Sequence, residues 1–225
     1  MMDNIEKAVL IGEEIGRTLI KKNKIEITNY DASKYFSKII DDYNAIYLEC
    51  KMPDSILGHT LKDNLGTSIM INKKLKNGRK NFTTAHEIGH LILHSDNNHE
   101  VETSKTLATT DKNFSPLEVE ANTFAAHLLM PDDVLMYQVL SNFSLTAITN
   151  TSKISKDSIY WRIVNFLKDN VGVNHNLAMA WAEEYKYTHK NADVGKTMLA
   201  YQMGKYNLRN FDMYQDYYSK SRIPF

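Results

Sequence analysis

NFTTAHEIGHLILH, residues 81–94, places two histidines, His86 and His90, four positions apart with Glu87 between them. The apolar residues of this stretch favour a helix that is buried along one side. On a helix, positions i and i+4 share a face, so both imidazoles can bind one metal ion. Glu87 then stands beside the open coordination position, where it can take a proton from water. The alternative is a surface helix in which Thr84 to Glu87 forms a capping box.

A third metal ligand is expected on a second helix, because catalytic zinc usually has three protein ligands. This helix is predicted to begin at Ser115-Pro116 and to end at Pro131. Glu118 and Asn122 share one of its faces, and Glu120 points about 160° away from the middle of that face. Glu118 as a ligand, with Asn122 orienting a metal-bound histidine, is geometrically coherent. The alternative is that Glu118 is the carboxylate of a capping box with Ser115.

The rest of the chain predicts an α+β arrangement, with short strands between helices. Apolar periodicity predicts helices over residues 3–24 and 31–42, and strand-forming residues predict strands at 45–50, 58–61 and 67–72. Residues 95–115 are polar without clear periodicity, and everything beyond Pro131 is predicted to be helical. The 67–72 strand is a candidate edge against which a peptide could add as another strand. The alternative is that this strand is paired on both sides.

Composition excludes several classes of protein. The 225 residues carry 27 basic and 27 acidic side chains, so the net charge of zero disfavours a strongly basic nucleic-acid binder. The single cysteine, Cys50, excludes an internal disulfide and a cysteine-rich zinc site, and it favours a cytoplasmic location. The first residues lack the basic region of a signal peptide, and no apolar run approaches the roughly 20 residues of a membrane helix. We therefore expect no membrane contact.

Two blocks, NFTTAHEIGHLILH at 81–94 and EVEANTFAAHLLMP at 118–131, together resemble the ImmA/IrrE family of metallopeptidases. The resemblance implies a zincin-like domain over residues 1–134, with a small sheet and an active-site helix. A helical region over residues 135–225 would follow it. The resemblance also implies that Zn2+ is bound by His86, His90 and Glu118, and that Glu87 is the general base.

Three further side chains are candidate donors in the active-site cleft. His94 continues the i+4 series from His90, although a histidine at a helix end can instead complement the helix dipole. His127 stands where many relatives in the family carry an acidic or other polar residue, and the alternative is a surface histidine. Tyr137 could donate a hydrogen bond to an oxyanion, and the alternative is core packing.

The resemblance also implies a substrate class, namely a helix–turn–helix repressor of a phage or mobile element, or of a stress operon. Cleavage would relieve repression, so the chain would be a cytoplasmic zinc endopeptidase with an anti-repressor role. The alternative is a zincin-fold regulatory module that binds a repressor or DNA without hydrolysis.

The second half of the chain contains a segment, at about residues 144–168, that resembles a helix–turn–helix. Its basic excess is small for a surface that tracks phosphates, so we favour structural packing of these helices over DNA binding. A tyrosine-rich tail occupies residues 176–225. It fits either a partner-binding surface or the core of a small helical cap.

Overall fold

The computed structural model describes residues 3–94, 102–103, 115–188 and 191–209. Helices and one sheet in this part of the chain confirm the α+β class. The chain forms two compact units, one from residues up to Gly16 with Ala32–Leu129, the other from Arg17–Asp31 with residues from Met130 onward. The expected domain boundary after residue 134 stays a prediction. No helix of the described ranges has both the length and the apolar composition that a membrane crossing requires.

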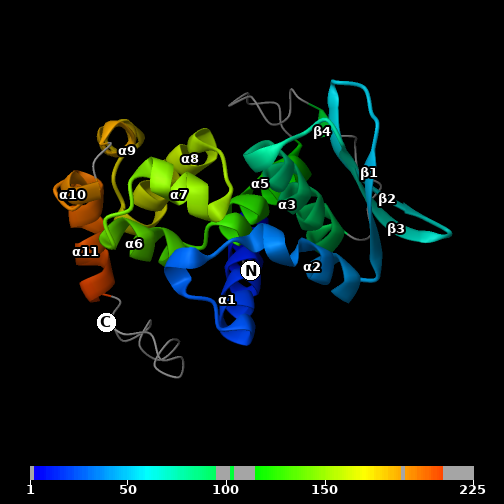
Figure 1. Ribbon diagram of the computed structural model, residues 1–225, viewed down its shortest axis with the longest axis horizontal. Helices are drawn as coiled ribbons and strands as arrows, with labels where there is room; N and C mark the ends of the chain where they lie inside the picture. The colour runs from blue at the N-terminus through cyan, green and yellow to red at the C-terminus, as the bar shows by residue number, and fades with distance from the viewer. Residues whose placement is uncertain (1–2, 95–101, 104–114, 189–190, 210–225) are drawn as a thin grey trace. The chain divides into compact units, whose positions relative to one another are not determined.

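A four-stranded sheet forms one layer of the first unit (Figure 1). Its strands are β1 (Ala45–Cys50), β2 (Ile56–Asp63), β3 (Gly66–Asn72) and β4 (Glu102–Thr103), in the order β1-β3-β2-β4.

The expectation that the 67–72 strand is a sheet edge is wrong. β3 pairs in parallel with β1 and antiparallel with β2 along its whole length. The short turn after Asp63 folds β3 back onto β2, and the side chains of Ile69 and Ile71 are fully buried. A strand whose inward face is so apolar is stabilised at the centre of a sheet.

Helix α3 (Asn77–Leu93) packs against β2 and β3, and helix α5 (Pro116–Leu129) packs against α3 (Figure 1). Ile88 and Phe124 are fully buried where these helices meet the core. Because α3 begins at Asn77, residues 84–87 lie in its interior, and Thr84 donates to the carbonyl of Lys80. The capping-box alternative for these residues is therefore wrong.

The N-terminal helix is confirmed as α1 (Asn4–Asn23), which contributes its first part to the first unit and its last part to the second. A short 3-10 turn, η1 (Ile27–Asn29), follows it. The helix predicted over 31–42 is divided into a 3-10 turn, η2 (Ala32–Tyr35), and α2 (Phe36–Asp42), which packs against β1.

The second unit is helical, as predicted for the residues beyond Pro131. Its further elements are α6 (Asp132–Leu140), α7 (Leu145–Ser152), α8 (Lys156–Phe166), the π-helical turn η3 (Leu167–Val171), α9 (His175–Tyr187), α10 (Asn191–Val194) and α11 (Met198–Arg209). Ser144 and Ser155 cap α7 and α8, and each hydroxyl accepts a backbone N–H. The interpretation of this pair as a helix–turn–helix stays a prediction.

A buried arginine connects elements of the second unit. Nε of Arg162, on α8, donates to the carbonyl of Met130 at 2.9 Å, and its Nη2 pairs with the carboxylate of Asp132. Met130 lies just before α6, and Asp132 is its first residue. Arg162 therefore holds α8 against the start of α6.

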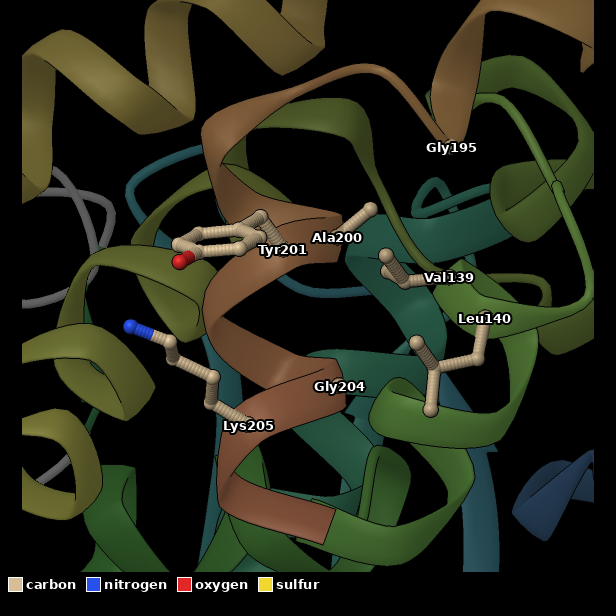
Figure 2. A pocket seen from close by; sticks show the side chains of 7 residues that line it. All are labelled: Val139, Leu140, Gly195, Ala200, Tyr201, Gly204 and Lys205. Atoms are coloured by element: carbon tan, nitrogen blue, oxygen red, sulfur yellow. The ribbon is translucent and has the colours of Figure 1, made fainter. Parts of the chain in front are cut away.

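Helices α6 and α11 line a pocket in the same unit (Figure 2). Its lining residues are Val139, Leu140, Gly195, Ala200, Tyr201, Gly204 and Lys205. The ammonium group of Lys205 lies 4.6 Å from the centroid of the Tyr201 ring, a cation–π contact on the surface of α11.

Candidate metal centre

Two histidines of α3 and one glutamate of α5 come together in the first unit. Nε2 of His86 lies 3.0 Å from Nε2 of His90. The two carboxylate oxygens of Glu118 lie 3.3 Å and 3.2 Å from these same nitrogens. All three side chains are buried, and their ligand atoms lie within 4.8 Å of one another. The structure thus groups the expected ligands, and their role as ligands stays a prediction.

Close packing of α3 and α5 produces this grouping. One helical turn separates His86 from His90, and Glu118 lies in the first turn of α5. The two helices approach each other at Gly89, where a Cβ atom would lie 3.1 Å from the Phe124 ring and 3.2 Å from the backbone of Ala121. Glycine at this position therefore lets α5 bring Glu118 against the histidines.

The donor set fits a zinc ion. Two imidazole nitrogens and a carboxylate oxygen are typical ligands of hydrolytic zinc. Among the described residues, Oε2 of Glu118 and Oε1 of Glu87 are buried without a hydrogen-bond partner. Buried polar atoms are rarely left unpaired, and an ion with a water molecule would satisfy both.

The surroundings of Glu118 favour its ionised form, which is the form that binds a metal. Burial raises the pKa of Glu118, but the closeness of His86 and His90 outweighs this effect. The result is a pKa far below the ordinary value of 4.5. The same side chain contacts the two histidine rings rather than Ser115, so the geometry does not favour the capping-box alternative.

Asn122 lies one turn after Glu118 on α5, and its Oδ1 is 2.9 Å from Nδ1 of His86. An amide oxygen only accepts hydrogen bonds, so Nδ1 of His86 carries the proton. Its Nε2 then directs a lone pair toward His90 and Glu118. Asn122 therefore lies where it can orient His86, as the helical spacing predicts.

His94, expected as a cleft donor, is the buried C-cap of α3 and contacts two other side chains. Its Nδ1 lies 3.0 Å from Nδ1 of His90, and its Nε2 lies 2.9 Å from the carboxylate of Glu120. Burial lowers the pKa of His94 below 6.5, against an opposing effect of Glu120. The i+4 spacing from His90 was the only sequence signal for this contact.

Glu87 has a partner that sequence reasoning missed. Oγ1 of Thr60, on β2, lies 2.6 Å from Oε2 of Glu87 and 3.1 Å from its backbone carbonyl. β2 approaches closely because residue 58 is glycine, whose Cβ would lie 2.9 Å from Oε1 of Glu87. No local pattern links residues 60 and 87, so only the packing of α3 on β2 reveals the pair.

The remaining two candidates lie elsewhere. Nδ1 of His127 lies 2.8 Å from the carboxylate of Glu13, so α5 and α1 share this pair. Tyr137 lies on α6 in the second unit, where burial raises its pKa. The structure does not bring either one into the His86, His90 and Glu118 group, and their role as donors stays a prediction.

Comparisons with known proteins agree with this geometry. A peptidase family model, described as the IrrE N-terminal-like domain, matches residues 42–159, more than half of the chain. The match contains the His86–His90 motif and the Glu118 block. An uncharacterized immunity region protein 2 of Bacillus phage phi105 is 30% identical over 151 residues, which cover 67% of this chain and 88% of the relative. The chain therefore belongs to the ImmA/IrrE family, in its phage type.

Proposed function

We propose that this protein is a zinc-dependent endopeptidase of zincin-like architecture. The observation that carries the proposal is the His86, His90 and Glu118 group. Glu87 follows His86 in the sequence, and its Oε1 is buried with no hydrogen-bond partner among the described residues. Three protein ligands leave an open coordination position, which is typical of catalytic rather than structural zinc.

The residues of the chain divide the work of hydrolysis. A bound zinc ion supplies Lewis-acid chemistry, polarising the scissile carbonyl and making water more acidic. Oε1 of Glu87 accepts a proton from the attacking water, and Glu87 then passes this proton to the leaving amine. Thr60 holds the other oxygen of the same carboxylate, so the base is fixed in one orientation.

The proposed substrate is a helix–turn–helix repressor, whose cleavage in the cytoplasm would relieve repression. Two observations support this choice: the family is one of peptidases, and the phage relative is named an immunity region protein. The balanced charge of the chain also suits a protein substrate better than DNA.

Glu87→Gln tests the proposal, because it removes the base and keeps the shape of the side chain. The variant is expected to lose cleavage by at least about 100-fold and to retain zinc and partner binding. Cleavage is measured by mass spectrometry, after incubation with the repressor encoded beside the gene, with and without chelator. The matched control is Glu14→Gln, an exposed glutamate of α1, which is expected to cleave normally.

The same variant separates the proposal from its alternative, a module that regulates by binding alone. If Glu87→Gln relieves repression in cells as well as the natural chain does, hydrolysis is not the mechanism. Loss of derepression together with retained repressor binding supports the peptidase.

A further inference from the structure

A chain of buried polar contacts leads away from the metal centre on the side opposite to the metal-facing nitrogen of His90. Nδ1 of His90 lies 3.0 Å from Nδ1 of His94, and Nε2 of His94 lies 2.9 Å from Oε2 of Glu120. The other oxygen of Glu120 accepts from the side-chain amide of Asn4 at 3.1 Å. We name this the His90–His94–Glu120 chain.

The donors and acceptors of the chain determine one arrangement of protons. An ionised carboxylate only accepts, so the hydrogen of His94 lies on Nε2. A neutral imidazole has one N–H, and Nδ1 of His94 is therefore an acceptor. The proton of His90 must then lie on its Nδ1, which leaves a lone pair on Nε2 facing His86 and Glu118.

We propose that His94 and Glu120 are positioning residues for the metal ligand His90. They hold its ring and its tautomer, and the carboxylate charge increases the donor strength of Nε2. Asn122 holds His86 in the same tautomer through a neutral amide. The two histidines are thus held by different groups: His86 by the neutral amide of Asn122, and His90 by His94 and the charged carboxylate of Glu120.

Burial distinguishes this chain from an incidental surface contact. His94 is 4% exposed and Glu120 is 7% exposed, so water does not replace either contact easily. Glu14, an exposed glutamate of α1, is the matched control for Glu120.

The inference rests on the proposed metal centre, and metal affinity tests it without a substrate. Zn2+ affinity is measured by competition with a chromophoric chelator, and Co2+-substituted protein reports the ligand field in its visible spectrum. His94→Leu removes the acceptor for His90 and is expected to weaken zinc binding by about 10- to 100-fold. His94→Asn, which keeps an oxygen near the position of Nδ1, is expected to lose less.

Glu120→Gln removes the charge and keeps the shape. It is expected to weaken zinc binding, by less than His94→Leu does, and to shift the cobalt spectrum. Glu14→Gln makes the same chemical change at an exposed position of α1 and is expected to leave both readouts unchanged. Thermal unfolding of the metal-free variants shows which of them are folded. If His94 and Glu120 had a purely structural role, the variants would be less stable but would bind zinc with unchanged affinity.

The inference is overturned if folded His94→Leu and Glu120→Gln bind zinc as tightly as the natural chain. It is also overturned if Glu14→Gln weakens zinc binding as much as Glu120→Gln. A natural chain that binds zinc but cleaves no repressor contradicts the peptidase proposal and leaves the positioning role intact. A natural chain that binds no zinc overturns both.

Discussion

The two oxygens of the Glu87 carboxylate have different surroundings. Oε2 lies 2.6 Å from the hydroxyl of Thr60, and Oε1 is buried without a hydrogen bond among the described residues. Thr60 has one hydroxyl proton and two nearby acceptors on Glu87, and the carboxylate oxygen is the nearer and the charged one. Thr60 therefore holds Oε2, and Oε1 remains for the reaction.

Thr60→Val is expected to lower kcat for repressor cleavage by about 10- to 100-fold, because it removes a hydrogen bond to a charged group. KM and zinc affinity should change little, since the hydroxyl of Thr60 bonds to Glu87 and not to a proposed ligand. Thr60→Ser keeps the hydroxyl and should retain most of the activity. An unchanged kcat in Thr60→Val would show that Glu87 does not need this support.

Tyr185, on α9, predicts a pH dependence of stability in the second unit. Its ring is fully buried, its hydroxyl donates to the carbonyl of Phe143, and burial raises its pKa above the ordinary value of 10.0. The unfolded chain ionises this hydroxyl near pH 10, while the folded chain keeps the proton. The stabilisation is therefore complete below pH 10 and declines as the pH rises above it.

Tyr185→Phe should lower the free energy of unfolding by about 1 kcal/mol at pH 7, because the Phe143 carbonyl loses its donor. Above pH 10 this difference should shrink by about 1.4 kcal/mol per pH unit. Urea unfolding of both proteins at pH 7 and at pH 10.5 measures it. A difference that stays constant across this range would mean that Tyr185 ionises in the folded state.

At the scale of elements, the metal centre depends on the distance between α3 and α5. These helices lie close together at Gly89, where any side chain would press on the ring of Phe124 and on the backbone of Ala121. Backbone atoms cannot move aside as a flexible side chain can, so the helices themselves would have to separate.

Gly89→Ala is expected to lower the free energy of unfolding by about 1–3 kcal/mol and to weaken zinc binding, because Glu118 moves away from the histidines. Denaturant unfolding and the chelator competition measure the two effects. Gly204→Ala is the matched control, since its Cβ would lie 3.9 Å from Leu140, an ordinary contact on α11 (Figure 2). Unchanged zinc affinity in folded Gly89→Ala would contradict this role of the helix contact.

Most elements could be predicted from local sequence, and their pairing could not. Apolar periodicity and the Ser115-Pro116 start located α1, α3 and α5, because these signals act within one helix. The position of β3 at the centre of the sheet depends on which strands hydrogen-bond to it. That pairing joins residues far apart in the sequence, so the pattern of one strand cannot reveal it.

At the scale of the whole molecule, burial of a basic side chain reduces the positive charge that the helix–turn–helix-like segment presents to solvent. The chain carries no net charge, and Arg162, one of the few basic residues of the helix–turn–helix-like segment, is bound to Met130 and Asp132. An arginine that is 3% exposed offers little to a phosphate backbone. The accessible charge of this segment is therefore smaller than its sequence indicates.

Binding to non-specific duplex DNA at about 0.15 M salt is therefore expected to be weaker than about 10 μM. Fluorescence anisotropy of a labelled duplex measures it, and repressor binding by the same protein is the positive control. Submicromolar DNA binding that falls steeply with salt, and that Lys156→Ala weakens, would contradict this expectation and support the DNA-binding alternative.

The sequence by itself determined the family and the residues of the proposed chemistry: the two histidines of one helical turn, the glutamate between them, and Glu118 with Asn122 on one face of the second helix. Helix geometry, which repeats every 3.6 residues, places these residues on shared faces, and the resemblance to the family implies their roles. Tertiary structure alone decided that Thr60 holds Glu87 and that Glu120 supports His90 through His94. The Thr60–Glu87 and His94–Glu120 contacts each join two elements, and only the packing of a complete core brings such side chains together.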